Sequence, residues 1–264
     1  MIQATIIADS ISPEDFRLTT IECTFHRFIL PEVNTYRMWS RSAQSSRAIP
    51  LKKRIEEVRE NPAIPVYWGK NQKGMVAEEE LSEEEKIEAE SVWIESANAA
   101  VDYATYLQKM NVHKQTAARI LEPYLWQTNV ISSTDWENMF RQRIHPDAQP
   151  EFKVLAEKIK EALYNSVPNR VEQEEWHLPY ITEEEKNEYT IELLTKASVA
   201  RVAKTSYGNQ GGWDIEKDLE LEARLFSAEP KHYAPYEMIA TPAGMFAPKG
   251  NFLGWKQLRH MIEG

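Results

Sequence analysis

The run LTTIECTF, residues 18–25, decides which class of fold this sequence can adopt. β-Branched and aromatic residues dominate it and no glycine or proline interrupts it, so it predicts a strand. Residues 2–8, just upstream, predict a second strand. The rest of the chain is mostly helical in pattern and does not alternate strands with helices. This indicates an α+β fold rather than repeated βαβ units.

Helical patterns fill most of the chain beyond residue 30. Helices are expected at residues 30–41, 51–59, 82–110, 113–126, 134–143, 149–165, 183–203 and 214–227, with a last apolar turn at 253–262. Ser82 and Glu85 fit a capping box that opens the long helix. Thr134 and Glu137 fit a second one, and Asp147 is a candidate cap for the helix after it. No repeat or linker divides the sequence, so residues 1–264 are expected to form a single domain.

Composition and charge exclude several classes of protein. The 264 residues carry a formal net charge of −10, which argues against general nucleic-acid binding, because that usually needs a basic surface. No segment approaches the ~20 apolar residues of a membrane span, and the N-terminus has no signal-like basic region. The only cysteine, Cys23, cannot form an internal disulfide, so a reducing, cytoplasmic location is expected.

Motifs for several common chemistries are absent. The chain has no GxGxxG, no P-loop and no GxSxG, so neither a dinucleotide-binding turn nor a nucleophile elbow is predicted. Its six histidines include no i, i+4 pair, and a single cysteine cannot make a zinc knuckle. No metal site is therefore expected.

Three polar clusters are the positive signals. In the first, Arg37, Arg41 and Arg47 alternate with serines, and Arg37 and Arg41 would share a face of the expected helix. A small-residue loop that ends in arginine offers N–H groups, hydroxyls and a bidentate fork, which suit a phosphate. The other interpretation is a solvated loop with ordinary surface arginines.

The second and third clusters are weaker by themselves. The second contains Arg119, Asn138 and Arg143, followed by an acidic and amide-rich turn; the third contains His232 and Glu237. Arg143 would otherwise be a helix C-terminal arginine that the helix dipole favours. His232 would otherwise be a surface-loop histidine.

Together the clusters resemble the flavin-dependent thymidylate synthase family, in particular its phage-type branch. TYRMWSRSAQSSR, residues 35–47, is similar to the family signature and keeps its arginines at 37 and 47 and its serines at 40 and 45. RILEP, residues 119–123, resembles the family helix that supplies a phosphate-binding arginine. Arg143 with DAQPE, residues 147–151, resembles the segment whose arginine contacts the pyrimidine ring.

The third cluster resembles a family motif that stands in another place along the chain. HYAPYEM, residues 232–238, and ARVAKTSY, residues 200–207, are similar to segments that precede the signature in the family. The resemblance therefore implies a circular permutation, with the family's first third moved to residues 190–245. The implied fold is the α+β fold of thymidylate synthase-complementing proteins, an antiparallel or mixed sheet with long helices, in permuted order.

The resemblance also implies a site that draws on all three clusters. The residues expected to bind the nucleotide substrate are Glu32, Ser45, Ser46, Arg47, Arg119 and Arg143. Those expected to bind the flavin are Arg37, Ser42, Asn138, Ser206, Ala234 and Glu237. Arg143, on the pyrimidine ring, and His232, which would orient folate or flavin, are the expected catalytic residues.

The implied reaction moves a one-carbon unit from methylenetetrahydrofolate to C5 of dUMP and gives dTMP, with FAD as cofactor and NADPH as reductant. This route uses no protein nucleophile, which suits a chain whose one cysteine falls within an apolar strand. Family members are homotetramers with sites shared between subunits, so the same is expected here. The expected partners are a small-molecule nucleotide and a folate, with neither nucleic acid nor membrane.

Five positions depart from the family pattern and keep alternatives open. Thr35 and Tyr36 stand where the signature has Arg-His, and Ser42 stands where it has Asn. Ala234 and Met238 replace Thr and His of the third motif. Several of these are flavin contacts in the family. The chain could therefore be a relative that hydroxymethylates a pyrimidine deoxynucleotide, or a non-catalytic nucleotide-binding protein that has lost flavin.

Overall fold

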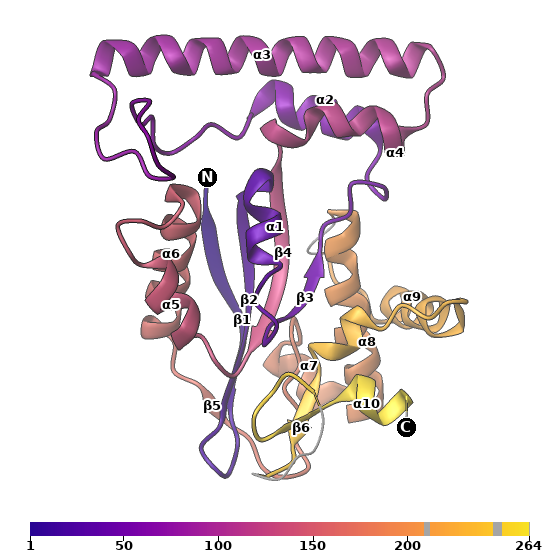
Figure 1. Cartoon of the computed structure of the whole chain (residues 1–264). Coiled ribbons are helices and arrows are strands. Elements are labelled where there is room, and N and C mark those ends of the chain that lie inside the picture. Colours follow the sequence, from indigo (N-terminus) through magenta and orange to yellow (C-terminus); the bar gives the residue numbers. More distant parts are fainter. Residues whose placement is uncertain (209–211, 245–249, 264) are drawn as a thin grey trace.

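A computed structural model describes residues 1–208, 212–244 and 250–263 of the chain. At its centre is a five-stranded sheet with strand order β3-β4-β2-β1-β5 (Figure 1). The strands are β1 (Gln3–Ile11), β2 (Arg17–His26), β3 (Ser40–Ala43), β4 (Trp126–Ser133) and β5 (Asn169–Arg170). The first four pair antiparallel and β5 joins β1 in parallel, so the sheet is mixed, as expected.

β2 contains the run that predicted it and lies in the middle of the sheet. Its Ile21, Cys23 and Phe25 are fully buried in one apolar cluster. Because side chains alternate along a strand, the intervening Thr24 points to the opposite face. The strands expected at 2–8 and 18–25 are confirmed, and each is slightly longer than predicted.

Helices α5 (Glu137–Arg143) and α6 (Pro150–Asn165) cover one face of this sheet (Figure 1). α6 presents Phe152, Leu155 and Ile159 to the cluster that β2 enters, and all three are fully buried. Burial of each such side chain stabilises the fold by roughly 1.5–3 kcal/mol. This packing holds α5, and hence Arg143, against the sheet.

The C-terminal part of the chain packs beside the β3 edge. It contains α7 (Glu183–Glu188), α8 (Ile191–Lys204), the 3₁₀ helix η3 (Thr205–Tyr207), α9 (Ile215–Ser227), the 3₁₀ helix η4 (Ala234–Glu237), β6 (Ala240–Pro242), β7 (Trp255–Gln257) and α10 (Leu258–Glu263). Fully buried Arg201 of α8 donates to Asp218 of α9 and to Glu185 of α7, both at 2.7 Å. The single helix expected at 183–203 is therefore wrong, because α7 and α8 are separate and pack together through this arginine.

Three helices lie across one end of the sheet: α2 (Leu51–Glu60), α3 (Glu83–Lys109) and α4 (Lys114–Ala117), with α3 outermost (Figure 1). The predicted capping box is present, since Ser82 Oγ accepts the Glu85 N–H and Glu85 accepts the Ser82 N–H. The helices expected at 51–59 and 82–110 are thus confirmed. None of the helices within the described ranges is long and apolar enough to cross a membrane.

The helix expected at 30–41 is wrong beyond its first turn. After the 3₁₀ helix η1 (Arg27–Ile29), α1 spans only Leu30–Val33 and residues 40–43 form β3. The serines of β3 are buried and their neighbours are half-buried, a period-two pattern that pairs with β4. Arg37 and Arg41 therefore share no helix face, and Arg41 donates to a backbone carbonyl five residues upstream.

The helix expected at 113–126 is wrong in its second half. α4 gives way to the 3₁₀ helix η2 (Ala118–Tyr124), which contains Pro123, a residue that lacks the N–H of an α-helical hydrogen bond. The chain then forms β4, which lies between β2 and β3 and received no assignment from the sequence.

Two predicted helix caps also differ. Thr134 and Glu137 form no capping box, because Thr134 Oγ1 accepts a backbone N–H from the C-terminal segment instead. Gln149 rather than Asp147 caps α6, and its Oε1 accepts the Phe152 N–H at 2.9 Å. In each case a hydrogen bond to or from another residue, close in space or in the sequence, replaces the one that the local pattern predicted.

Candidate functional site

Arg143, the last residue of α5, is the centre of a polar cluster on the α5–α6 side of the sheet. Its Nε donates to Tyr36 Oη at 2.9 Å and its Nη1 to Glu32 Oε2 at 3.1 Å. The guanidinium also lies over the Phe152 ring, with Cζ 4.5 Å from the ring centroid. The Arg143 side chain is 22% exposed, so it is a fixed cation that a ligand can still reach.

A 320 Å³ pocket adjoins this cluster. Arg37 and Asn138 line it, together with Thr35 and Gln142. Gln142 Oε1 accepts from Tyr36 Oη at 3.0 Å, which connects the pocket to Arg143. The structure thus brings together two predicted flavin contacts that are far apart in the sequence.

The loop after β3 carries the predicted phosphate contacts Ser45, Ser46 and Arg47. Ser45 N–H donates to the Ser206 carbonyl at 3.0 Å, and Ser45 Oγ accepts the Arg47 N–H at 3.3 Å. Ser46 is buried and Arg47 is exposed. The C-terminal segment therefore holds this loop through Ser206, a residue that the sequence placed with the flavin contacts.

Arg119 of η2 is held by an ion pair on the same turn. Its Nη1 donates to Glu122 Oε1 at 2.8 Å, and the same oxygen accepts from Arg27 Nη2 at 3.0 Å. Arg27 also donates to Gln127, whose Nε2 donates to the Gln44 carbonyl at 3.1 Å. This chain of hydrogen bonds links Arg119 to the end of β3, next to the 45–47 loop.

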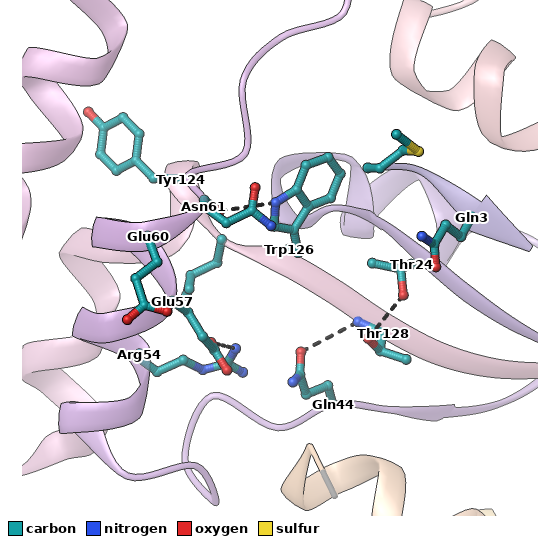
Figure 2. Close-up of a pocket in the computed structure, with 12 residues that line it drawn as sticks. Gln3, Thr24, Gln44, Arg54, Glu57, Glu60, Asn61, Tyr124, Trp126 and Thr128 are labelled. Atoms are coloured by element: carbon teal, nitrogen blue, oxygen red, sulfur yellow. Dashed lines mark hydrogen bonds and ion pairs between the residues drawn. The ribbon is translucent and has the colours of Figure 1, made fainter. Parts of the chain in front are cut away.

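A pocket of 380 Å³ lies between α2 and the strands, and Figure 2 shows the residues that line it. Thr24 and Thr128, on neighbouring strands, hydrogen-bond to each other at 3.3 Å, and Gln44 Oε1 accepts the Thr128 N–H at 3.4 Å. From α2, Arg54 pairs with Glu57 at 2.7 Å. The pocket is therefore polar on both walls and adjoins the 45–47 loop through Gln44.

Arg54 is a candidate that the sequence analysis missed. Its side chain is 1% exposed, and its Nε and Nη2 have no hydrogen-bond partner among the described residues. Burial lowers the pKa of the guanidinium, while the charge of Glu57 opposes that shift. The signal in the sequence was a cation on the apolar face of α2, between Leu51 and Val58. Unsatisfied guanidinium N–H groups suit an anion.

The remaining predicted flavin contacts lie around β3 and η4. Ser42 is buried and its Oγ donates to an α8 carbonyl at 3.3 Å, which satisfies the hydroxyl. Glu237 of η4 pairs with Arg259 of α10. Ala234 and His232 are exposed. Among the described residues, no three His, Cys, Asp or Glu side chains gather to hold a metal ion.

The predicted site residues thus fall into two groups. Thr24 lines the Arg54 pocket while Cys23 is buried with the α6 cluster, so that pocket and Arg143 lie on opposite faces of the sheet. Within the described ranges, no hydrogen bond or ion pair joins Arg143 directly to Arg119, Arg54 or the 45–47 loop.

Residues 7–169 match the sequence pattern of the family described as thymidylate synthase complementing protein. The fold is similar to that of the UMP/dUMP methylase PolB from Streptomyces cacaoi bound with 5-Br dUMP, with a TM-score of 0.51 and 14% identity over 62% of this chain and 90% of that chain. The PolB complex with 5-Br UMP gives a TM-score of 0.50 and 13% identity over 62% and 88% of the two chains.

The flavin-dependent thymidylate synthase ThyX from Helicobacter pylori, complexed with FAD and dUMP, is 21% identical over 55% of this chain and 67% of that chain, with a TM-score of 0.37. No curated protein matches the sequence.

The matched residues include every predicted site residue from Glu32 to Arg143, whereas Ser206, His232 and Glu237 lie beyond them. At such low identities the likeness to PolB concerns the fold. The family pattern spans more than half of the chain, and its α+β fold is the one observed. The chain therefore belongs to the thymidylate synthase complementing protein family.

Proposed function

We propose that this protein transfers a one-carbon unit from methylenetetrahydrofolate to C5 of dUMP, giving dTMP, with FAD as cofactor and NADPH as reductant. The observation that supports it most is the Arg143–Glu32–Tyr36 cluster beside a pocket lined by Arg37 and Asn138. Arg143 and Asn138 meet the 32–37 segment only through the tertiary fold. All of these residues except Tyr36 were assigned to substrate or flavin by motif position.

The Arg143 cluster has the right donors and acceptors for a pyrimidine. The Watson–Crick edge of uracil presents a carbonyl, an N3–H and a second carbonyl. Arg143 can donate to a carbonyl and Glu32 can accept from N3–H, because the two side chains already lie 3.1 Å apart. A fixed guanidinium at the carbonyl stabilises negative charge that develops on the ring as C5 becomes nucleophilic. Arg143 would therefore be the main catalytic residue.

The pocket beside that cluster fits part of a flavin. Arg37 and Asn138 supply polar groups at its wall and Trp39 supplies an aromatic one, a combination typical of sites for flat heterocycles. Its 320 Å³ holds a ring system rather than a whole FAD. When bound, FAD would supply the electrons that reduce the transferred carbon. Tyr36, which replaces the family histidine, would position Arg143 through the hydrogen bond that it accepts.

The phosphate of the nucleotide would bind to the second group of residues. Ser45, Ser46 and Arg47 offer hydroxyls, N–H groups and an exposed guanidinium. Arg119 is half-exposed, and buried Arg54 has two nitrogens without a hydrogen-bond partner among the residues that the structure describes. Clustered arginines can bind an anion in spite of the net charge of −10.

Two sites on opposite faces of one sheet would meet only between copies of the chain. We therefore propose a homotetramer with shared sites, in which Arg143 from one subunit and the 45–47 loop from another contact one nucleotide. The contact between Ser206 and Ser45 fits a circularly permuted order, because it returns a segment that the family carries N-terminally to the β3 edge. Ser42, Ala234, Glu237 and His232 would then complete the folate and flavin side. The expected location is the cytoplasm.

The first experiment is a visible absorption spectrum of the protein after incubation with FAD and desalting, followed by anaerobic NADPH. Retained flavin peaks that bleach with NADPH, and faster when dUMP is present, support the proposal. Absence of retained flavin would favour a nucleotide-binding protein without redox chemistry.

The product has a second candidate, a 5-hydroxymethyl pyrimidine nucleotide. The observation that favours it is the replacement of flavin-side residues by Thr35 and Tyr36, both of which lie at the pocket that adjoins Arg143. The mass of the nucleotide product decides between the two, because a hydroxymethyl group is heavier than a methyl group by one oxygen.

A further inference from the structure

The outermost helix, α3, carries an apolar stripe that no residue in the described part of the chain covers. Val92, Tyr103, Tyr106 and Met110, just past its end, are 59%, 68%, 62% and 59% exposed, and Ala99 between them is exposed as well. At ~100° per residue these five positions fall on one narrow stripe along the helix.

The helix already buries its other side against the rest of the chain. Ala97, Val101 and Ala104 are buried in a cluster with α2, α4 and η2. A surface helix normally has one apolar face and one polar face. α3 has a second apolar stripe that faces away from its own chain, and such a stripe marks a contact surface.

The two halves of the stripe have complementary shapes. In its N-terminal half, α3 and Trp68 enclose a 420 Å³ groove, which Glu88, Val92, Trp93 and Ser96 also line. In its C-terminal half the two exposed tyrosines project from the helix. A surface that holds both a groove and matching large side chains can pair with itself in an isologous contact.

We propose that this stripe, defined by Val92, Ala99, Tyr103, Tyr106 and Met110, binds the same stripe of a second copy of the chain in antiparallel orientation. Pairing centred on Ala99 places Tyr106 of each copy opposite Val92 of the other, at the Trp68 groove. The small side chain at the centre allows the helix axes to approach closely. Antiparallel pairing also places opposite ends of the two helix dipoles together.

The charges along the stripe are consistent with this register. Lys109 of each copy would lie near Glu88 of the other, which adds an attractive pair at both ends. Glu95 of each copy would lie near Asp102 of the other, and this pair opposes association. The apolar stripe thus supplies most of the affinity and the outer pair favours the antiparallel orientation.

The length of the helix gives an adequate interface. Its 27 residues extend for about 40 Å, and a helix pair of that length, with the tyrosines and Trp68 at its core, approaches the roughly 800 Å² per partner of a standard interface. Aromatic side chains are enriched at the centre of such contacts. The inference does not depend on the proposed reaction, since no stripe residue belongs to either group of site residues.

Sedimentation equilibrium tests the interface. Tyr106→Glu should halve the mass of the assembly without changing the thermal midpoint of the isolated subunit, because loss of one isologous contact divides a closed assembly in two. Ile87→Glu is the matched control, since Ile87 is 72% exposed on the same helix but lies about 140° from the stripe. An unchanged mass for Tyr106→Glu, or a monomeric wild type, overturns the proposal.

Cross-linking tests the orientation. The only native cysteine, Cys23, is buried, so introduced cysteines can be linked selectively with a short bismaleimide. A mixture of Val92→Cys and Tyr106→Cys chains should give linked dimers, whereas each variant alone should give almost none. Links within the Val92→Cys sample alone would indicate parallel pairing and would overturn the antiparallel register.

Discussion

A protein in which glutamine replaces His177 should lose much less stability in acid than the wild type does. His177 is fully buried between the sheet and the C-terminal part of the chain. Its Nε2 lies 2.7 Å from Thr20 Oγ1 and its Nδ1 lies 2.9 Å from Ser10 Oγ. Burial lowers the pKa of His177 to about 3, whereas a free histidine has a pKa of about 6.5.

The sign of the pH effect follows from that difference. A group whose pKa is lower in the folded state binds its proton more readily after unfolding, so acid favours the unfolded chain. The contribution of His177 to the free energy of unfolding is complete above about pH 6.5 and is lost as the pH falls toward the pKa of the folded state. At pH 5, about 1.5 units below the unfolded pKa, the loss is roughly 2 kcal/mol at 1.36 kcal/mol per unit.

The assay is urea unfolding of the wild type and of His177→Gln at pH 7 and pH 5. The variant is less stable at pH 7, since glutamine cannot reach both hydroxyls, but it should lose about 2 kcal/mol less than the wild type on acidification. Contributions from other groups are shared by both proteins and cancel in the comparison. Exposed His145, replaced by glutamine, should leave the wild-type pH dependence intact. Equal losses for the wild type and His177→Gln would refute the reasoning.

Three further substitutions test the site and the core. Arg143→Ala should reduce turnover by about 10²–10³-fold, because it removes the fixed charge that we propose to lie at the pyrimidine carbonyl; steady-state rates of dTMP formation measure this. Arg201→Ala should lower the free energy of unfolding by roughly 1.5–3 kcal/mol, because buried Asp218 loses the charged hydrogen bond from Arg201 and keeps the ion pair with Lys204; urea titration measures it. Arg54→Met should leave the thermal midpoint unchanged or raise it, because a buried, partly unsatisfied cation is removed, yet should weaken dUMP binding measured by calorimetry.

Two of these substitutions, Arg143→Ala and Arg201→Ala, have a control in the same element. Arg141→Ala, on exposed surface of α5, should keep the activity that Arg143→Ala loses. Lys196→Ala, at a half-exposed position of α8, should change stability by no more than about 0.5 kcal/mol. Full turnover in Arg143→Ala would remove the central catalytic assignment, and unchanged dUMP affinity in Arg54→Met would exclude that pocket from the phosphate site.

Local sequence signals predicted elements whose stability is local. The box at Ser82 and Glu85 specified where α3 begins, because both partners lie within one turn. The β-branched run at 18–25 predicted β2 because its residue types favour an extended backbone. The signal failed at β3, where a serine-rich stretch becomes extended only because β4 supplies its hydrogen-bond partners.

The candidate site shows the same division. Motif position alone placed Glu32, Arg37, Asn138 and Arg143 in one site, and the fold brings them into one polar cluster with an adjoining pocket. Tyr36 looked like a departure from the family pattern, and only the structure shows its hydroxyl against Arg143.

The sequence by itself determined the fold class and the family and predicted most residues of the candidate site, because these inferences depend on residue types at fixed spacing. Only the tertiary structure decided that the C-terminal segment holds the 45–47 loop through Ser206, that the described residues leave N–H groups of buried Arg54 unsatisfied, and that α3 presents a second apolar stripe outward. Such features depend on which surfaces pack together, and packing joins residues that no local pattern connects.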